Sequence, residues 1–344
     1  MKAAFFNGSG QMVVSDHPDP VPGDYDAIIK VRATGICGSD LLMNNDKTEA
    51  DELPAGHEVG GEIVEVGKKV DKALVGKRVA IETIGQGRAC ESCWFCRSGQ
   101  YRQCTNMAAP EGGGFAQFIK RKAIGCYEID KNTSWSQSAL VEPLAVSIHG
   151  ARRGELKGGD KVVVLGAGTI GLTAVVAAKQ LGAGKVIVTA RHDQQAKMAL
   201  NLGADIALNS DSPNTGEEIL ELTDGRGADL TIETVGGKNP ATLVQAVEFT
   251  RMQGRISILG GFRTPLTFDW LKPLLKEQSI HFSSCYGVID GKHDYEMAID
   301  MFSNGTTNLA DIVTHKFGLD SIQQGFECAY DKKTGSIKVQ IHQD

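Results

Sequence analysis

Hydrophobic and polar residues alternate along the first third of the chain in short runs that predict β-strands. Ala27–Ala33 and Val59–Val66 place apolar residues at about every second position, and Gly, Pro and Asp separate such runs. At Glu142–Arg153 the apolar spacing becomes that of a helix, and Pro143 can occupy the first turn of that helix. The chain is therefore expected to begin as irregular β structure and to enter a helix near residue 142.

After Gly158 the chain alternates between short β-rich runs and helical stretches. The predicted strands are Val162–Leu165, Val186–Thr189, Leu230–Thr234 and Arg255–Leu259. Alternation of strand and helix at this spacing predicts a parallel, doubly wound sheet, so the fold class is α/β. A further apolar run lies near Ile280, an amphipathic helix is expected around Tyr295–Phe302, and Ile337–Ile341 is expected to form the last strand.

The length of 344 residues predicts two domains at about 150 residues per domain. We expect the doubly wound domain over residues 148–282 and the other domain over residues 1–147 and 283–344. The last segment is expected to return to the first domain because the termini of such folds tend to lie together.

Charge and hydropathy exclude several partners. The net charge is −6, from 36 Lys and Arg against 42 Asp and Glu, which leaves no excess of positive charge for nucleic acid or an anionic membrane. The longest charge-free apolar stretch, Val162–Ala178, is interrupted by three glycines and is too short to span a membrane. The N-terminus does not resemble a secretory signal, so a cytoplasmic protein is expected.

A glycine-rich turn follows the first predicted strand of the doubly wound sheet. It reads Gly166-Ala167-Gly168-Thr169-Ile170-Gly171 and leads into a helical stretch rich in Ala, Val and Leu. Between a strand and a helix, this G-x-G-x-x-G pattern is typical of a Rossmann dinucleotide site. The glycines allow a tight turn, close approach of the pyrophosphate and close packing of helix on sheet, and the helix N-terminus attracts the phosphates. The alternative is a glycine-rich turn without a ligand.

The end of the second strand indicates which dinucleotide binds. NAD sites usually carry an acidic residue there, about 20 residues after the motif, which binds the ribose hydroxyls. Here Ala190 removes the carboxylate that would repel a 2′-phosphate, and Arg191 supplies a guanidinium that can pair with it. The sequence therefore favours NADP(H), with NAD(H) possible if Arg191 is merely solvated and Asp193 binds the ribose.

Eight cysteines in a chain without features of an exported protein favour metal ligands, core residues or reactive thiols over disulfides. Four of them have the spacing of a closed tetrahedral zinc site, which leaves no position for a substrate and predicts a structural role: Cys90, Cys93, Cys96 and Cys104. An iron–sulfur cluster and four unliganded thiols are the alternatives.

A second group of possible ligands is dispersed. Cys37 follows a predicted strand, His57 and Glu58 follow Gly56, and Glu142 opens the helix that leads into the doubly wound domain. Thiolate, imidazole and carboxylate together suit a zinc ion with an open coordination position. Each residue alone is weak evidence, because a single Cys is usually buried in the core and an isolated Glu is usually solvated.

These motifs together resemble the zinc-containing medium-chain dehydrogenase/reductases over essentially the whole chain. They are G-I-C-G-S-D, G-H-E-V-G-G, the four-cysteine lobe, V-E-P-L-A-V and G-A-G-T-I-G, and the polyol branch with sorbitol dehydrogenase is the most similar. The resemblance implies a GroES-like catalytic domain beside the Rossmann domain and two zinc ions per chain. It places Cys37, His57 and Glu58 around the catalytic zinc and Glu142 where relatives carry a third ligand. Which of Glu58 and Glu142 bonds the metal directly stays open.

Two further residues acquire roles from the resemblance, and two positions depart from it. Ser39 would take the hydroxyl proton of the substrate, and Asp40 would orient the Cys37 loop or a zinc ligand. Many relatives carry a His where this chain has Leu42, so a relay that ends in histidine is doubtful. Ala190-Arg191 replaces the Asp common in the family, which agrees with the preference for NADP(H).

The resemblance implies a zinc-dependent oxidoreductase that interconverts a secondary alcohol, a polyol or diol, and a ketone or ketose by hydride transfer with NADP(H). The alternatives are a butanediol or threonine-type dehydrogenase that uses NAD(H) and, from another class, a non-catalytic zinc- and NADP-binding protein. A zinc-free quinone or enone reductase would lack both groups of ligands.

The sequence bears less directly on substrate and assembly. The polar and acidic segment Leu41–Pro54 favours a small hydroxylated substrate, unless it is only a solvated loop. A phosphorylated sugar would require cations such as Lys47, Arg97 or Arg102. A homo-oligomer, dimer or tetramer, is expected, with the strand near Ile280–Phe282 and the strand end 259–261 as possible pairing edges.

Overall fold

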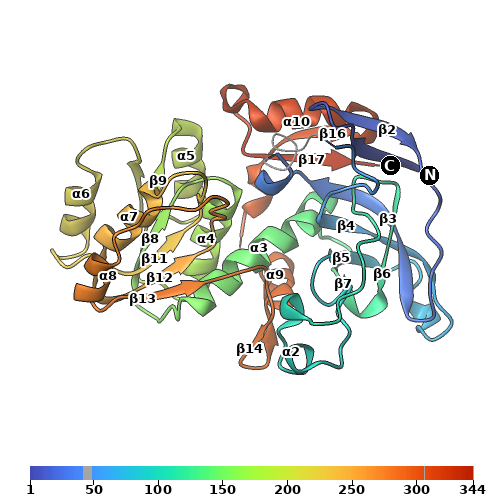
Figure 1. Cartoon of the computed structure of the whole chain (residues 1–344), viewed down its shortest axis with the longest axis horizontal. Coiled ribbons are helices and arrows are strands. Elements are labelled where there is room, and N and C mark those ends of the chain that lie inside the picture. Colours follow the sequence, from blue (N-terminus) through green and yellow to red (C-terminus); the bar gives the residue numbers. More distant parts are fainter. Residues whose placement is uncertain (42–48, 306, 344) are drawn as a thin grey trace. The chain divides into compact units, whose positions relative to one another are not determined.

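A computed structural model describes residues 1–41, 49–305 and 307–343, and they form two compact units (Figure 1). Unit 1 comprises Met1–Glu142, Tyr286–Thr306 and Ala310–Asp344, and unit 2 comprises Pro143–Cys285 and Thr307–Leu309. The α/β class is confirmed: a mostly antiparallel β unit and a parallel α/β unit occur in one chain.

Unit 1 is built on a seven-stranded sheet in the order β16-β17-β3-β4-β5-β7, with β6 also paired to β3. The strands are β3 (Asp26–Gly35), β4 (Glu58–Val66), β5 (Arg78–Glu82), β6 (Phe118–Lys122), β7 (Cys126–Glu128), β16 (Val313–Gly318) and β17 (Lys338–His342). Side chains on β3, β4 and β5, among them Ile29, Val59, Ile63 and Ile81, form one fully buried core cluster. This core fixes the ends of β3, β4 and β5, from which the candidate site is built.

Smaller elements complete unit 1. They are β1 (Lys2–Phe6), β2 (Met12–Asp16), α2 (Trp94–Arg97), β14 (Val288–Ile289), β15 (Lys292–His293), α9 (Asp294–Ser303) and α10 (Ile322–Tyr330). The C-terminal strand β17 pairs antiparallel with β3, with Gln340 opposite Gly35. The last strand of the chain therefore borders the segment that leads to Cys37.

Helix α3 (Trp135–Arg153) begins earlier than the hydrophobic spacing predicted. Ser134 and Gln137 form a reciprocal cap: the Gln137 Oε1 accepts from the Ser134 N–H at 2.8 Å, and the Ser134 Oγ accepts from the Gln137 N–H at 3.2 Å. Pro143 consequently lies inside the helix, and its predicted place in the first turn is wrong. The capping pattern S-x-x-Q was the sequence signal for the true start.

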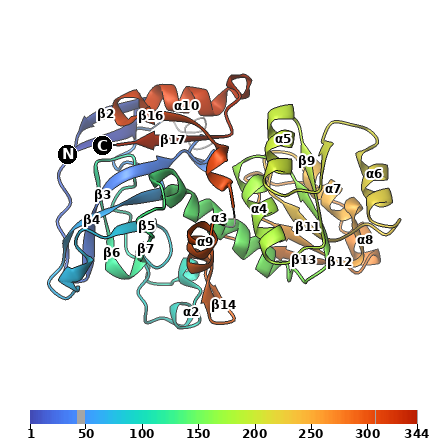
Figure 2. The ribbon, with the colours of Figure 1, turned by 180° about the vertical axis from the view of Figure 1, so that it is seen from behind.

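Unit 2 contains a six-stranded, entirely parallel sheet in the order β10-β9-β8-β11-β12-β13. Its strands are β8 (Lys161–Leu165), β9 (Lys185–Ala190), β10 (Ile206–Asn209), β11 (Ala228–Glu233), β12 (Thr250–Ile258) and β13 (Ser279–Phe282). Its helices are α4 (Thr169–Gln180), α5 (Asp193–Asn201), α6 (Thr215–Leu222), α7 (Ala241–Phe249) and α8 (Leu271–Leu275). Figures 1 and 2 show helices on both faces of this sheet, as the doubly wound prediction requires.

Strand order and burial explain where this sheet can bind a ligand and where it has an edge. Val163 and Leu165 pack on residues of α6 and α7, whereas α4 packs on β8 and β9 and with α5. The order reverses between β8 and β11, and ligands of such sheets bind at the carboxyl ends of strands beside this switch point.

Strand β13 lies at one edge of the sheet, whereas β12 is paired on both sides. The expectation that residues 259–261, at the end of β12, could offer a pairing edge is therefore wrong.

Candidate active site

Three possible metal ligands from different segments converge in unit 1. Ligand atoms of Cys37, His57 and Glu58 all lie within 4.8 Å of one another. Cys37 follows the end of β3, and His57 and Glu58 stand at the start of β4, where Gly35 and Glu58 are register partners. The antiparallel pairing of β3 and β4 therefore brings residues twenty positions apart in the sequence to one point.

Asp40 fixes the backbone at Cys37. The Asp40 Oδ2 accepts a hydrogen bond from the Cys37 N–H at 2.9 Å, and the Asp40 and Leu41 N–H groups both donate to the Cys37 carbonyl, which starts a helical turn. The Asp40 Oδ1 lies 3.8 Å from the His57 Nδ1. One buried carboxylate thus orients the thiol segment and faces the imidazole.

Glu58 has a partner that the sequence motifs did not indicate. Both Glu58 carboxylate oxygens accept hydrogen bonds from the Lys338 Nζ at 2.8 Å, and both side chains are only 1% exposed. The same ammonium donates to the Ile36 carbonyl at 3.0 Å. A Cβ at Gly35 would lie 1.8 Å from the Glu58 Oε2, so only glycine leaves room for this carboxylate beside β3.

Glu142 is buried in α3 but lies outside the group whose ligand atoms converge within 4.8 Å. Burial raises the pKa of Glu142 to about 7; His57 lowers it, and Glu58 raises it further. Helix α3 lies close to β4 at Gly60, where an added Cβ would lie only 2.0 Å from the Ser138 Oγ. Ser39 is half-buried on the same turn as Asp40.

The donor set of this first group fits zinc. Sulfur, imidazole nitrogen and carboxylate oxygen are the atoms that zinc prefers, and sites with three protein ligands leave a position for water or substrate. The second group has four sulfur donors, and Cys90, Cys93, Cys96 and Cys104 Sγ atoms also lie within 4.8 Å of one another. Four thiolates complete a tetrahedral site, which fits a structural ion.

Hydrogen bonds favour the thiolate at Cys90, whereas burial raises the pKa of Cys96 in the same lobe to about 12. The Ser92 hydroxyl and the Ser92 and Cys93 N–H groups lower the pKa of Cys90 to about 5, and the Cys90 Sγ accepts from the Cys93 N–H at 3.3 Å. The Cys104 Sγ accepts from the Cys90 N–H at 3.2 Å. Sulfurs that already accept N–H bonds are suited to the deprotonated state that metal binding requires.

The glycine-rich turn of unit 2 has the predicted geometry. Gly166 has φ +91°, and its N–H donates to the Thr189 Oγ1 at 3.0 Å. A Cβ at Gly171 would lie 1.9 Å from the Gly166 carbonyl oxygen, whereas a Cβ at Gly168 would meet nothing within 4 Å. Helix α4 starts at Thr169 without a side-chain cap, so its first N–H groups, including that of Ile170, can bind a phosphate.

Arg191 is exposed at the end of β9, directly after the buried Ala190. Its Nε lies 3.6 Å from the Asp211 Oδ2, and the two side chains are 70% and 60% exposed. Helix α5 begins at Asp193, with His192 as its N-cap residue, so Asp193 lies in the first turn of the helix. The end of β9 therefore presents a guanidinium and, next to it, the carboxylate of Asp211, which the sequence did not predict.

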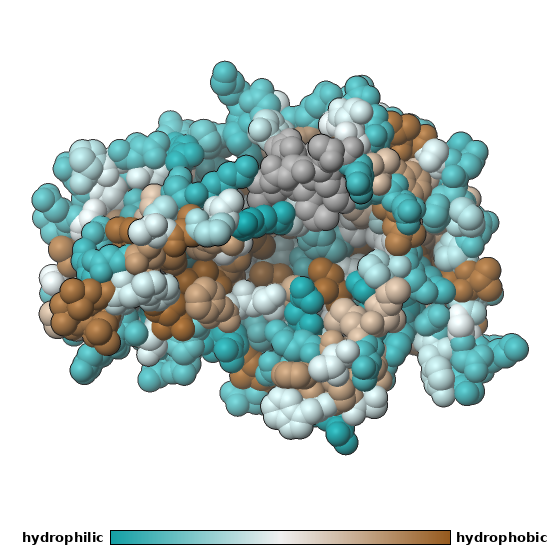
Figure 3. Space-filling model, in the orientation of Figure 1, coloured by the Kyte–Doolittle hydropathy of each residue, from teal (hydrophilic) through white to brown (hydrophobic). Residues whose placement is uncertain are grey.

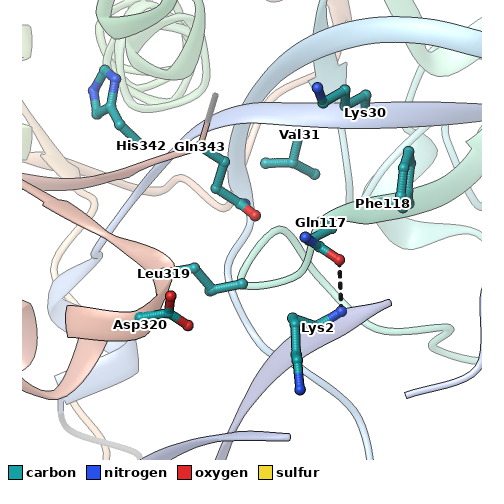
Figure 4. Close-up of a pocket in the computed structure, with 9 residues that line it drawn as sticks. All are labelled: Lys2, Lys30, Val31, Gln117, Phe118, Leu319, Asp320, His342 and Gln343. Carbon is teal, nitrogen blue, oxygen red and sulfur yellow. Dashed lines mark hydrogen bonds between the residues drawn. The ribbon is translucent and has the colours of Figure 1, made fainter. Parts of the chain in front are cut away.

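Several predicted substrate contacts receive no support from the structure. Leu42 and Lys47, with half of the polar segment Leu41–Pro54, lie outside the described residues. Arg97 and Arg102 are exposed in the four-cysteine lobe. A separate pocket of about 460 Å³ in unit 1 is lined by residues from β1, β3, β6 and β17 and by Asp320, and Lys2 and Lys30 lie on opposite sides of it (Figure 4). None of its lining residues belongs to either group of candidate ligands.

The chain belongs to the zinc-containing medium-chain dehydrogenase/reductase family. Residues 23–131 match the alcohol dehydrogenase GroES-like domain, and residues 169–304 match the zinc-binding dehydrogenase domain. The sorbitol dehydrogenase of Bacillus subtilis is 33% identical over 99% of this chain and 97% of its own length. The L-threonine 3-dehydrogenase of Pyrococcus horikoshii is 32% identical over 95% of this chain and 94% of its own length. The protein is accordingly a zinc-dependent dehydrogenase of the alcohol and polyol type, which acts on CH–OH groups.

Solved structures show the same fold with either cofactor. An alcohol dehydrogenase of Escherichia coli CFT073, in complex with NADH, has a TM-score of 0.88 at 27% identity and covers 100% of this chain and 99% of its own. A zinc-binding dehydrogenase of Sinorhizobium meliloti, bound to NADP, has a TM-score of 0.84 at 25% identity and covers 99% of each chain. The fold therefore does not choose between the two cofactors.

Proposed function

We propose that the chain interconverts a secondary alcohol of a small polyol or diol and the corresponding ketone or ketose with NADP(H), at a zinc ion held by Cys37, His57 and a carboxylate. The convergence of Cys37, His57 and Glu58 in a chain of this family carries the proposal. When bound, zinc supplies Lewis acidity toward a substrate oxygen, and the nicotinamide exchanges hydride.

The residues of the chain have distinct tasks in this reaction. Ser39 Oγ takes the hydroxyl proton toward water, and Asp40 holds the Cys37 segment and faces His57, which fixes both donors. Glu58 has its charge balanced by Lys338, whereas burial raises the pKa of Glu142 to about 7 in the metal-free site. Glu142 is therefore the proposed alternative ligand that exchanges with water.

A metal and activity assay tests this function directly. We expect two zinc ions per chain by elemental analysis and NADP(H)-dependent turnover of members of a panel of polyols, ketoses, diols and amino alcohols. Cys37→Ser should lose one ion and turnover, whereas Cys328→Ser, a control outside both groups of ligands, should keep both. Unchanged turnover in Cys37→Ser would refute the proposed zinc site. Dinucleotide binding with no turnover of any panel member would point to the non-catalytic alternative.

The preference for NADP(H) rests on Arg191. A charge-assisted hydrogen bond contributes about 1.5–3 kcal/mol, so Arg191→Ala should lower the ratio of kcat/KM for NADPH over NADH by about 10–100-fold. Asp211→Asn should raise that ratio because it removes the carboxylate that lies 3.6 Å from the guanidinium. Arg226→Ala, which breaks an equally exposed pair with Asp224, is the control and should leave the ratio unchanged. A wild-type preference for NADH would exclude this part of the proposal.

Unit 2 carries an apolar surface that supports a homodimer. Trp270, Leu271, Leu274 and Leu275 around α8 are 58–72% exposed, and Phe282 on the edge strand β13 is 68% exposed; Figure 3 shows apolar residues gathered over α8. An unpaired edge and an apolar patch are both covered if two copies pair β13 with β13. Phe282→Glu should therefore lower the mass measured by light scattering, and Val21→Glu in unit 1 should not.

A cytoplasmic location belongs to the same proposal. None of the eight cysteines, all of which lie in the described residues, forms a disulfide, which suits a reducing compartment. Among the described helices, none has the length and apolar character that crossing a membrane requires. Fractionation of cells that express the protein should recover it in the cytosolic fraction.

A further inference from the structure

Arg121 is a buried cation that no step of the proposed reaction uses. It lies on β6 and is 5% exposed. Within the described part of the chain, its hydrogen bonds all go to carbonyl oxygens: Nε to Thr83 at 3.2 Å, Nη1 to Lys120 at 2.6 Å and Nη2 to Gly112 at 2.6 Å. Burial lowers the pKa of Arg121 to about 10, so the side chain stays charged at neutral pH. A buried charge without a carboxylate partner is costly, which indicates that its contacts serve a purpose.

The two distant segments that Arg121 joins both hold the backbone at His57. The Thr83 Oγ1 donates to the His57 carbonyl at 2.9 Å. In the other segment, the Gly114 N–H donates to the Gly56 carbonyl at 2.8 Å. Arg121 therefore connects the two segments that donate hydrogen bonds to the consecutive carbonyls of residues 56 and 57.

The packing leaves little freedom in these supports. A Cβ at Gly113 would lie 2.3 Å from the Gly56 carbonyl oxygen, so the two loops are in backbone contact. The Thr34 Oγ1 on β3 also donates to the Gly114 carbonyl at 2.8 Å. A shift of the 112–114 loop would move the backbone at Gly56, next to His57, because the two loops are in direct backbone contact.

We propose that Arg121 is a positioning residue that sets the metal affinity of the Cys37–His57–Glu58 site by fixing the backbone of His57 through Thr83 and Gly112. This inference rests on the proposed function. The planar guanidinium holds two carbonyls from two loops in one fixed geometry, which an ammonium cannot reproduce. Partners that orient a metal ligand typically contribute about 10–100-fold in affinity.

The test measures metal binding at each site separately. The enzyme is loaded with zinc or cobalt and titrated with a chelator, the bound metal is counted, and the cobalt absorption spectrum reports the geometry of the site. Arg121→Lys and Arg121→Met should both release the ion of the Cys37–His57–Glu58 site at about 10–100-fold lower chelator strength and alter its spectrum. The ion of the four-cysteine lobe should be retained, which distinguishes the effect from general unfolding.

Two further variants make the result decisive. Arg78→Lys is the matched control, because Arg78 also donates to a backbone carbonyl, that of Thr133, from the opposite end of β5. It should leave both affinities unchanged. Thr83→Val removes the bond to the His57 carbonyl and nearly preserves volume, so it should weaken the same site if the Arg121 variants fail to fold.

The outcomes separate the two proposals. Wild-type protein that binds only the lobe ion would refute the proposed function. Wild-type protein with two ions, together with unchanged affinity in folded Arg121 variants, would overturn the role of Arg121. If those variants do not fold, unchanged affinity in Thr83→Val would overturn it as well.

Discussion

The buried pair of Lys338 and Glu58 gives the sharpest test of how charge is balanced at the Cys37–His57–Glu58 site. Lys338→Met keeps an unbranched apolar chain but removes the ammonium that donates to both Glu58 oxygens at 2.8 Å. Both side chains are 1% exposed, so water cannot replace the lost partner without rearrangement. Breaking a buried pair in this way costs about 3–5 kcal/mol, and we expect that loss in the free energy of unfolding of the metal-free enzyme.

Zinc should reduce this loss. A divalent ion beside Glu58 supplies the positive charge that Lys338 provides in the metal-free enzyme, since ligand atoms of Cys37, His57 and Glu58 lie within 4.8 Å of one another. The variant should therefore be destabilised more in chelator than in zinc. The measurement is urea denaturation of wild type and variant in both conditions, with intrinsic fluorescence as the probe.

A double-mutant cycle completes the experiment. Glu58→Gln combined with Lys338→Met leaves no buried charge in the pair, so the double variant in chelator should be more stable than the sum of the single losses implies. Equal destabilisation in chelator and in zinc, or a loss below about 1 kcal/mol in chelator, would refute the reasoning, because a loss that small is typical of an exposed pair.

Three further predictions concern other parts of the chain. Gly168→Ala should keep the wild-type Tm but bind NADP(H) at least tenfold more weakly by fluorescence titration, because its Cβ would meet no protein atom within 4 Å. Gly171→Ala should lower the Tm, because its Cβ would lie 1.9 Å from the Gly166 carbonyl oxygen. Equal losses of Tm in the two variants would contradict this prediction. Burial raises the pKa of Asp229, but the Lys161 N–H and Arg251 lower it below its usual range. Asp229→Asn should therefore lose stability at neutral pH, and its difference from wild type should shrink as the pH falls below about 4; a difference that grows in acid would reverse the sign. Brief chelation should abolish turnover before it changes NADPH binding, because the donors of the Cys37 site and the glycine turn belong to different units; simultaneous loss of both would contradict this.

The sequence predicted those features whose cause is local. The parallel sheet of unit 2 follows from alternating strand and helix patterns, and the turn at Gly166 follows from a backbone conformation that favours glycine. The four cysteines of the lobe lie within one short segment, so their spacing alone brought them together. Hydrophobic spacing alone places the start of α3 too late in the sequence, whereas the cap formed by Ser134 and Gln137 marks the true start.

Features that depend on distant contacts were not predicted. Lys338 lies in a correctly predicted strand, but only the pairing of β17 with β3 brings it to Glu58. The strand alternates apolar residues with Lys338 and Gln340, a pattern that also fits a half-exposed strand, so the sequence did not indicate that this lysine is buried. Asp211 and Arg121 gave no signal either, because their roles follow from the neighbouring strand and from two loops.

Residues 58 and 338 are separated by 280 positions, and this separation has a consequence for synthesis. Nearly all of unit 2 leaves the ribosome before β17 exists, so it can fold while the chain is still growing. During that interval Glu58 has no cation and β3 lacks one of its neighbours. If unit 2 folds during synthesis, the nascent chain holds a complete parallel sheet while the Cys37–His57–Glu58 group still lacks Lys338.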